Sequence, residues 1–351
     1  MNTSVIITQS LGEEVTQCIA RLHPDSVFVL VDTNTNTYCL PVFRQTWLQP
    51  FSLIDIAAGD DHKNAESLAH VWQLLSAGKA TRNSLLINLG GGMITDLGGF
   101  AASTFKRGIR YINIPTTLLG AVDAAVGGKT GINFNGLKNE VGVIRQAEAV
   151  ILFPPFFSTL DERNMLSGYA EMLKHALLKS YDEWRAIITI DFQSVDYQRL
   201  GILIQHSIEI KEDIVRQDPV EKNIRKALNL GHTIGHAFES FSYTTNYPLL
   251  HGYAVAFGLA CELYLSHVKL GFPKEPLQQL IQIIKENYGI IHFGCAHYET
   301  LYELMTHDKK NDASGVNFTL LSDIGQIQIN QHSEKDVIFE SFDFLRESLG
   351  F

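Results

Sequence analysis

The chain has 351 residues, of which 45% are hydrophobic and 19% charged, and its formal net charge is -10. This acidity argues against binding nucleic acid or an anionic membrane through bulk charge, but a local basic pocket for a small anion remains compatible with it. The length favours two domains. We expect a cytoplasmic protein, because the four cysteines form no CxxC pair, the first residues lack a signal-peptide pattern, and no apolar run could span a bilayer.

The first half of the chain alternates between predicted strands and helices. Short apolar runs predict buried parallel strands at residues 26–32, 84–91, 109–117 and 148–155. Helical spacing predicts helices at residues 96–104 and 64–78, the latter with Asn64 as its cap and Gly78 as its stop. This alternation is typical of an α/β domain with a parallel, Rossmann-like sheet that binds ligands where the strands end.

From about residue 157 the pattern becomes mostly helical, and residues 318–329 form the one plausible hairpin. Pro154 and Pro155 mark the boundary, since prolines remove backbone donors and stop regular structure. We therefore expect an α/β domain over residues 1–156 and a mostly α-helical domain over residues 157–351.

The segment NLGGGMITDLGGF lies between a predicted strand and a predicted helix. Its glycines Gly90, Gly91 and Gly92 would let the backbone approach a pyrophosphate at a helix N-terminus. The spacing departs from GxGxxG, so a nucleotide site and a plain structural turn both stay open. Asp32, followed by Asn34, ends an earlier strand and has two similar interpretations, a ribose contact or a cap of its own backbone.

Residues 114–142 are rich in small residues and contain Lys129, Lys138 and Asn139. Glycines beside a lysine suit a phosphate or nucleotide contact, although the spacing is not that of a P-loop. The alternative is a glycine-rich surface loop with solvated lysines. Asp123, which lies in an otherwise apolar part of the segment, argues against that alternative.

Two polar groups further along the chain have helical spacing. Glu171, Lys174 and His175 share one helix face among apolar neighbours, which indicates a partly buried face where a solvated ion pair would be the default.

Arg225, Asn229, His232 and His236 follow at steps of four, three and four, and we predict that they line one face of a single helix and grip one ligand. A zinc site is also indicated, but HTIGH lacks the glutamate of the metalloprotease motif. Spacing alone leaves open which three ligands such a site would use among Glu171, His232, His236 and His251.

Five segments in order, GGGMITDLGGF, IPTTLLGAVDAAVGGKTGIN, GLKN, AEMLKH and RKALNLGHTIGHA, resemble the 3-dehydroquinate synthase family of the sugar phosphate cyclase superfamily. The resemblance extends over nearly the whole chain. It implies an N-terminal domain that binds NAD and a helical domain that binds metal and substrate. It also implies a homodimer, with Zn²⁺ as the metal and Co²⁺ as a substitute.

The activity implied is that of a lyase of the shikimate pathway, which serves aromatic amino acid biosynthesis. The family converts 3-deoxy-D-arabino-heptulosonate 7-phosphate to 3-dehydroquinate and phosphate. The steps are transient oxidation by NAD, elimination of phosphate, reduction and an intramolecular aldol closure.

The resemblance also implies roles for individual residues. The zinc ligands would be Glu171, His232 and His251. The catalytic residues would be His236, as a proton-transfer residue and not a ligand, with Glu221, Lys174, Asp123 and Asn229. The substrate would be held by Lys129, Lys138, Asn139, Lys211, Arg225, one of Lys309 and Lys310, and Arg107 of the neighbouring subunit. The NAD contacts would be Asp32, Asn34, Asp60, Lys63, Gly90, Gly91, Gly92, Asp96, Thr116, Thr117, Phe156 and Thr159.

Four positions depart from the family pattern: Tyr253, Ala124, Ala125 and Ser167. They bear on fine tuning and cofactor affinity more than on the reaction class. Three alternatives remain: another cyclase such as a 2-deoxy-scyllo-inosose synthase, an NAD-dependent metal alcohol dehydrogenase, and an inactive binding protein.

Overall fold

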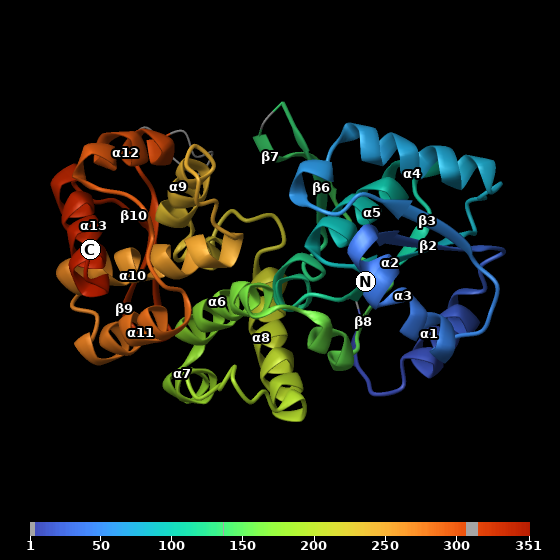
Figure 1. Cartoon of the computed structure of the whole chain (residues 1–351), viewed down its shortest axis with the longest axis horizontal. Coiled ribbons are helices and arrows are strands. Elements are labelled where there is room, and N and C mark those ends of the chain that lie inside the picture. The colour runs from blue at the N-terminus through green and yellow to red at the C-terminus, as the bar shows by residue number, and fades with distance from the viewer. Residues whose placement is uncertain (1–3, 136, 307–314) are drawn as a thin grey trace. The chain divides into compact units, whose positions relative to one another are not determined.

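The structure is a computed structural model that describes residues 4–135, 137–306 and 315–351 (Figure 1). The chain divides into two compact units. Unit 1 comprises Met1–Asp161 with Asp196–Ile208, and unit 2 comprises Glu162–Val195 with Glu209–Phe351. Lys309 and Lys310, one of which is expected to hold substrate, lie outside the described residues.

Unit 1 is built on a parallel sheet with the strand order β1-β8-β5-β4-β2-β3. Its strands are β1 (Ser4–Ile7), β2 (Val27–Asp32), β3 (Ser52–Ile56), β4 (Leu85–Gly90), β5 (Arg110–Pro115) and β8 (Ala149–Leu152). The four predicted strands, and the parallel sheet itself, are confirmed. The edge strands β1 and β3 were not predicted, because a half-buried edge strand lacks the continuous apolar run that identifies a central one.

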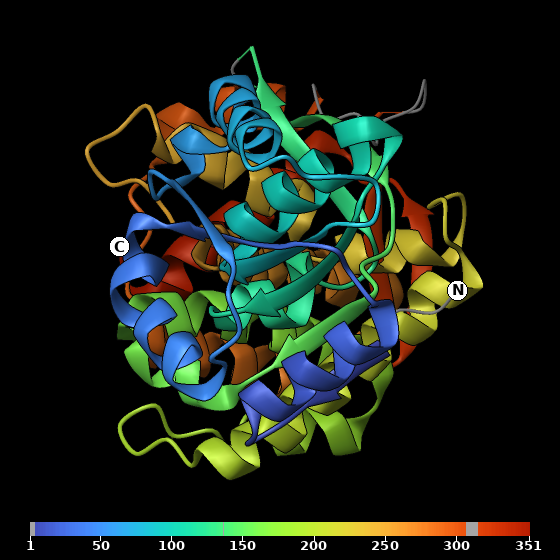
Figure 2. The ribbon, with the colours of Figure 1, turned by 90° about the vertical axis from the view of Figure 1, so that its right-hand side faces the viewer.

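Helices cover both faces of this sheet, as Figure 2 shows for α1 and α4. The helices are α1 (Leu11–Leu22), α2 (Thr33–Tyr38), α3 (Leu40–Thr46), α4 (Ala65–Ala77) and α5 (Gly92–Thr104). Successive residues of β2 point to opposite faces: Val29 packs with α1 and α3, whereas Leu30 packs with α4 and α5. The predicted cap of α4 is confirmed, since the Asn64 side chain accepts the Ser67 N–H at 3.0 Å.

A second, antiparallel pair of strands in unit 1 was not predicted. Within residues 114–142 and just beyond, β6 (Lys129–Phe134) pairs with β7 (Leu137–Ile144). A single π-helical turn, Gly120–Ala124, precedes the pair. The glycines that gave this segment the composition of a loop are needed for strand pairing: a Cβ at Gly131 would lie 2.7 Å from the Val141 carbonyl oxygen.

Unit 2 is mostly helical, around the buried helix α10 (His251–Leu270), which packs against α6, α9, α11 and α13. The other helices are α6 (Glu162–Lys179), α7 (Tyr181–Ile187), α9 (His232–Ser242), α11 (Lys274–Asn287), α12 (Tyr298–Thr306) and α13 (Lys335–Leu349). Helix α8 (Tyr197–Gln217) begins in unit 1 and ends in unit 2. The predicted hairpin is confirmed as β9 (Phe318–Asp323) and β10 (Gln326–Gln331).

The prediction of one helix face from Arg225 to His236 was wrong. Arg225 and Asn229 lie in a 3₁₀ turn, Ile224–Asn229, and α9 begins only at His232. Gly231 interrupts the path with a φ of 78°, in the left-handed region that favours glycine. Residue spacing could not reveal this break, because residues of a 3₁₀ turn and of the helix that follows it can still be three or four positions apart in the sequence.

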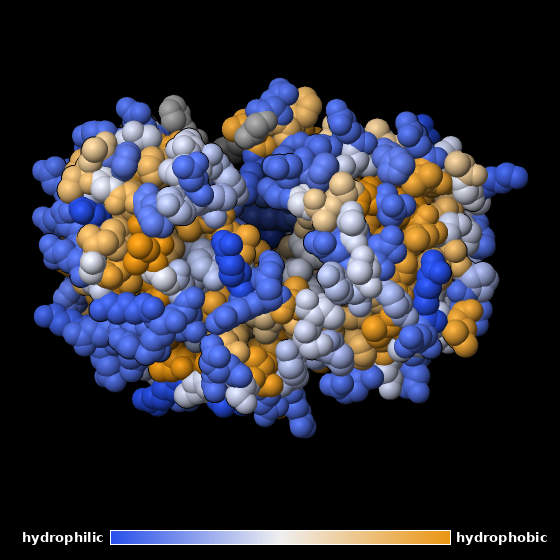
Figure 3. All heavy atoms as spheres, in the orientation of Figure 1, coloured by the Kyte–Doolittle hydropathy of each residue, from blue (hydrophilic) through white to orange (hydrophobic). Residues whose placement is uncertain are grey.

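A helix that spans a membrane needs sufficient length and apolar character. Among the helices that the structure describes, none is both long and apolar enough to cross a bilayer. On the face drawn in Figure 3, hydrophilic and hydrophobic residues are mixed.

Candidate active site and metal centre

Three side chains of unit 2 converge on one point. Glu171 comes from the middle of α6, while His232 and His251 are the first residues of α9 and α10. Their ligand atoms lie within 4.8 Å of one another. The Nε2 atoms of His232 and His251 lie 3.3 and 3.8 Å from Glu171 Oε1, a buried oxygen that accepts no hydrogen bond from the described residues. A divalent metal bound by all three would satisfy that oxygen.

The second nitrogen of each imidazole faces an acceptor. His232 Nδ1 lies 3.1 Å from the Leu230 carbonyl oxygen, and His251 Nδ1 lies 3.1 Å from Glu239 Oε2. These acceptors favour the tautomer that carries its hydrogen on Nδ1 and leaves the Nε2 lone pair for a metal. Sequence reasoning missed Glu239, although it follows His236 by three residues on the same helix.

The electrostatics of the centre favour the protonation states that a metal needs. Burial opposes ionisation of Glu171, but the Lys174 ammonium and His232 outweigh it and hold the pKa of this carboxyl well below its usual range. Burial and Lys174 lower the pKa of His232 to about 3, against the opposing effect of Glu171. An ionised carboxylate and a neutral imidazole are the ligand forms of a zinc-type site.

His236 lies beside this centre. Its ring centroid is 5.3 Å from that of His232 and 5.9 Å from that of His251. His236, Glu239 and His251 also satisfy metal-ligand spacing. The set with Glu171 fits better, because Glu239 already accepts from His251 Nδ1 and from the Tyr243 hydroxyl at 3.2 Å.

Four other predicted residues of unit 2 lie on α8 or on the segment that follows it. Asn229 Nδ2 donates to Glu221 Oε1 at 3.1 Å, and the buried Arg225 donates to the Pro219 carbonyl oxygen at 2.7 Å. Lys211, on α8, is 6% exposed.

A carboxylate that sequence reasoning missed shapes this segment. Asp218 accepts the backbone N–H groups of Lys222, Asn223 and Arg225 at 3.0, 2.6 and 3.1 Å. The Asp-Pro dipeptide formed with Pro219 is a turn signal, so it could have indicated this role.

Five predicted residues of unit 1 form one polar cluster. The ammonium of Lys63, a residue only 5% exposed, pairs with Asp96 and donates to Asn139 Oδ1 at 2.6 Å. Lys138 pairs with Asp60 at 3.3 Å. The structure thus brings together three residues expected to contact NAD and two expected to contact substrate.

The glycine run forms the turn from β4 to α5. Gly91 is the N-cap of α5, and no side chain caps this helix. A Cβ at Gly91 would lie 2.9 Å from Thr117 Cγ2, so the run packs directly against the predicted threonine. The neighbouring Thr116 donates its N–H to the Gly90 carbonyl oxygen at 3.0 Å. A helix N-terminus formed by backbone alone suits a pyrophosphate.

The remaining predicted cofactor contacts have clear local roles. Asp32 caps α2 by accepting the Thr35 N–H at 2.8 Å, the structural role weighed against a ribose contact, and Asn34 is exposed on the same helix. Phe156 is buried, and Thr159 donates to its carbonyl oxygen at 2.7 Å. Both belong to the 3₁₀ turn Pro154–Thr159.

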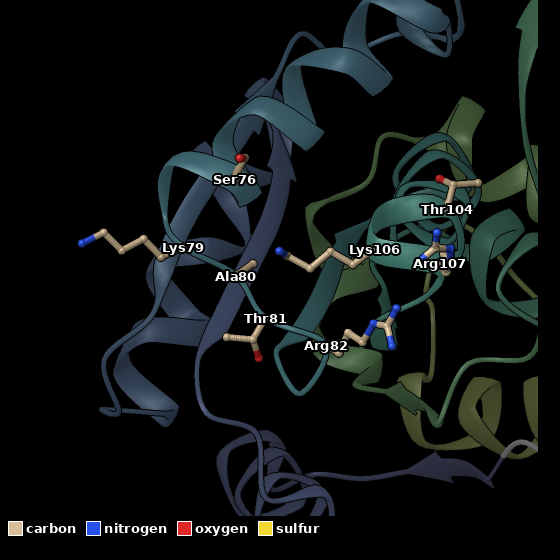
Figure 4. A pocket seen from close by; sticks show the side chains of 8 residues that line it. All are labelled: Ser76, Lys79, Ala80, Thr81, Arg82, Thr104, Lys106 and Arg107. Atoms are coloured by element: carbon tan, nitrogen blue, oxygen red, sulfur yellow. The ribbon is translucent and has the colours of Figure 1, made fainter.

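The last three predicted residues of unit 1 lie at ends of elements. Asp123 belongs to the π-helical turn, and Lys129 begins β6. Arg107 follows α5 with a φ of 67°. It lines an open cavity of about 800 Å³. Figure 4 shows three further basic residues at this cavity, Lys79, Arg82 and Lys106.

Three of the four departures from the family pattern now have a structural account. Ser167 Oγ accepts the N–H of Gly252 at 3.1 Å, so it joins α6 to α10 beside His251. Tyr253 packs edge-on against Tyr288, with ring centroids 4.9 Å apart. Ala124 ends the π-helical turn, where a Cβ at Gly92 would lie 3.1 Å from its Cβ. The structure does not explain Ala125.

Solved structures define the class of this fold. The chain matches a 2-deoxy-scyllo-inosose synthase complexed with carbaglucose-6-phosphate, NAD+ and Co2+, with a TM-score of 0.84 and 21% identity over 98% of this chain and 96% of that one. It matches ValA, a 2-epi-5-epi-valiolone synthase from Streptomyces hygroscopicus subsp. jinggangensis 5008 with NAD+ and Zn2+ bound, with a TM-score of 0.87 and 23% identity over 99% and 97%. The fold is therefore that of the sugar phosphate cyclases.

Sequence relatives define the family within this class. The 3-dehydroquinate synthase N-terminal model matches residues 53–167, and the C-terminal model matches residues 168–311. A 3-dehydroquinate synthase of Parabacteroides distasonis is 53% identical over 347 residues, covering 99% of this chain and 98% of the relative. One of Legionella pneumophila is 37% identical over 88% of this chain and 85% of the relative. The chain belongs to the 3-dehydroquinate synthase family.

Proposed function

We propose that this chain converts 3-deoxy-D-arabino-heptulosonate 7-phosphate to 3-dehydroquinate and phosphate, a step of the shikimate pathway. The observation that carries the proposal is the 53% identity over nearly the full length to a 3-dehydroquinate synthase. The convergence of Glu171, His232 and His251 in unit 2 supports it.

Two cofactors belong to this proposal. NAD would bind in unit 1, at the glycine turn and the Lys63 cluster, and a divalent metal, Zn²⁺ or Co²⁺, would bind Glu171, His232 and His251. When bound, NAD supplies hydride transfer, and the metal supplies Lewis-acid polarisation of substrate oxygens. The donor set fits a catalytic zinc-type site, since three protein ligands leave positions for substrate.

The residues around the metal would move protons. His236, whose ring lies beside both ligand imidazoles, is the proposed proton-transfer group at the reacting oxygens. Glu221 is the second acid/base group, oriented by its hydrogen bond from Asn229. Lys174 keeps Glu171 ionised through their buried ion pair. Asp123, in the π-helical turn Gly120–Ala124, is proposed as a further catalytic group.

Several cations are proposed to bind the anionic groups of the substrate. Arg225 suits the substrate carboxylate, because its planar guanidinium can bind both oxygens, and the buried Lys211 would assist it. Lys129, Lys138 and Asn139 are proposed for the phosphate end and middle of the substrate. One of Lys309 and Lys310 is proposed for the phosphate as well.

We also propose a cytoplasmic homodimer in which Arg107 acts on the phosphate bound by the neighbouring subunit. Three further basic residues line the open cavity at Arg107, which supports a role for this surface in binding an anion. Four thiols, Cys18, Cys39, Cys261 and Cys295, support a reducing compartment, because none of them is in a disulfide.

Phosphate release from the heptulosonate phosphate tests the proposal. The purified protein should release phosphate only with NAD and metal present, and NADH absorbance should show no lasting rise. Turnover of glucose 6-phosphate in place of the heptulosonate would favour another cyclase. Steady NADH accumulation would favour an alcohol dehydrogenase, and no metal binding together with no phosphate release would favour an inactive binding protein.

A further inference from the structure

Helix α10 carries a buried carboxylate that has no part in the proposed reaction. Glu262 lies three turns beyond His251 on this helix, and it is 0% exposed. An ionised carboxylate in the interior is costly unless its oxygens are hydrogen-bonded. The buried Glu262 carboxylate is therefore expected to accept hydrogen bonds from neighbouring groups.

Those partners are the backbone amides at the start of α9. Glu262 Oε2 accepts the Gly231 N–H at 2.6 Å, and Oε1 accepts the Ile234 N–H at 3.1 Å. The first amides of a helix have no acceptor within the helix, and a side chain at the N-cap usually supplies one. The N-cap of α9 is Gly231, which has no side chain. Glu262 supplies the missing acceptor from the neighbouring helix, where its charge also complements the helix dipole.

The two helices meet backbone to backbone at this place. A Cβ at Gly258 of α10 would lie 2.0 Å from the Gly231 carbonyl oxygen and 2.7 Å from the Gly235 nitrogen. A Cβ at Gly235 would lie 3.0 Å from the Ala254 carbonyl oxygen. The glycines therefore allow α9 and α10 to approach closely. The hydrogen bonds of Glu262 hold the start of α9 at one position along α10.

The residue that follows Gly231 in the chain is a proposed metal ligand. Gly231 donates to Glu262, and His232 comes next in the chain, while His251 starts the helix that carries Glu262. We propose that Glu262 is a positioning residue: by capping α9 from α10, it sets His232 against His251 at the distance that a metal requires. The inference rests on the proposed function in one respect, that these residues bind a divalent metal.

Cobalt binding tests this role without substrate or turnover. Wild-type protein and Glu262→Gln are stripped of metal and titrated with Co²⁺, and both the visible absorption spectrum and competition with a chelator are recorded. Glutamine keeps the size of the side chain but leaves only one oxygen for two amides. We expect about tenfold weaker cobalt binding, as is typical for loss of a group that orients a metal ligand. We also expect a changed spectrum, because His232 would bind in an altered geometry.

Ser266→Ala is the matched control. Ser266 is also buried on α10, where its hydroxyl accepts the Leu321 N–H at 3.0 Å and donates to the Glu262 carbonyl oxygen at 2.7 Å, so it joins α10 to β9 and not to α9. This variant should lower the melting temperature and leave cobalt affinity and spectrum unchanged. Glu262→Asp is the second variant, should the glutamine protein fail to fold: it keeps the charge, but its shorter side chain should bind cobalt less tightly than glutamate does.

The outcomes separate this inference from the proposed function. If Glu262→Gln and Glu262→Asp bind cobalt with wild-type affinity and spectrum, the cap is only structural and the positioning role is overturned. If the wild-type protein itself binds no cobalt, the metal site fails, and the proposed function and this inference fall together.

Discussion

Glu239 is the residue whose role follows most directly from a single contact. Its carboxylate accepts from His251 Nδ1, which fixes the tautomer and the ring orientation of a proposed metal ligand. We expect Glu239→Gln to weaken metal binding by about 10–100-fold and to lower phosphate release in parallel. Metal titration of the stripped protein, read by chelator competition, measures the first effect.

Tyr243→Phe is the control for this substitution. It removes the hydrogen bond from the tyrosine hydroxyl to Glu239 Oε1 and leaves the contact with His251 in place. Metal affinity should stay within about threefold of wild type if the His251 contact is what matters. Equal losses in both variants would show that Glu239 acts through general packing of α9.

Asp218 predicts a pH dependence of stability. Burial opposes ionisation of this carboxyl, but hydrogen bonds from the backbone of Asn223, Lys222 and Arg225 outweigh it and lower its pKa below the ordinary 3.8. A lowered folded-state pKa stabilises the folded protein above 3.8, and this contribution is lost as the pH falls through the folded-state value. Asp218→Asn should therefore lower the melting temperature near neutral pH, and the difference from wild type should shrink in acid.

Thermal melts of both proteins between about pH 7 and pH 3 measure this difference. Asp213→Asn provides the comparison, because the ion pairs of Asp213 with Arg216 and Lys179 are both exposed. Such a pair contributes roughly 0–1 kcal/mol, so its loss should have little effect at any pH. A difference for Asp218→Asn that persists undiminished in acid would contradict the charge-based account.

Sequence reasoning named candidate residues for the proposed metal centre but could not choose among them. Spacing left Glu171, His232, His236 and His251 as equal candidates, and the choice came from family resemblance. The distinction depends on what lies behind each ring, a carbonyl oxygen for His232 and Glu239 for His251. Those partners come from chain folding, and intervals along the sequence do not encode them.

At the scale of elements, the contact between α9 and α10 depends on Gly258. A Cβ there would overlap backbone atoms of Gly231 and Gly235, which cannot move aside as a flexible side chain could. We expect Gly258→Ala to destabilise the protein by about 3 kcal/mol or more, and to weaken metal binding because α9 must shift. Urea unfolding measures the stability, and cobalt titration measures the site.

Gly271→Ala is the matched control, at the glycine that caps the C-terminal end of the same helix. Gly271 follows the end of α10 with a φ of 76°, and nothing lies within 4 Å of a Cβ built there. Its substitution should cost only the backbone strain, about 1–2 kcal/mol, and leave metal binding intact. The close-packing account is wrong if the two alanine variants lose the same stability and keep the same metal affinity.

The elements that sequence reasoning identified are those with strong periodic signals. The four central strands were continuous apolar runs, and α4 had a recognisable cap at Asn64. The pair β6 and β7 was not predicted, because every residue of β7 is exposed. The strand therefore lacks the alternation of apolar and polar residues that identifies a half-buried strand. The break at Gly231 was not predicted, because a single glycine within a helical pattern does not indicate whether the helix continues.

At the scale of the whole molecule, the proposed dimer makes Arg107 a residue of the neighbouring active site. Arg107→Ala should weaken substrate binding at least tenfold, since it removes a charge-assisted contact to phosphate, and should leave NAD binding nearly intact. Kinetics with the heptulosonate phosphate measure the first effect, and equilibrium titration with NAD measures the second. Equal losses of both would show that Arg107 belongs to the cofactor site of its own chain.

Mixing two variants, measured at a substrate concentration where each alone has little activity, tests directly whether Arg107 acts in the neighbouring subunit. Arg107→Ala chains keep their own His236, and His236→Ala chains keep Arg107, so a mixed dimer has one complete site. Random exchange in a one-to-one mixture should restore about a quarter of wild-type activity. A mixture no more active than its parents, after exchange is verified, would place Arg107 in its own subunit's site or outside the reaction.

The three proposed metal ligands lie on helices α6, α9 and α10, far apart in the sequence. An unfolded chain does not hold them together, so metal binds the folded state of unit 2 and stabilises it by mass action. Above the dissociation constant, each tenfold rise in free metal adds about 1.4 kcal/mol to the free energy of unfolding. The cellular supply of metal would then govern how long each molecule resists proteolysis, and metal starvation would lower the abundance of the protein as well as its activity.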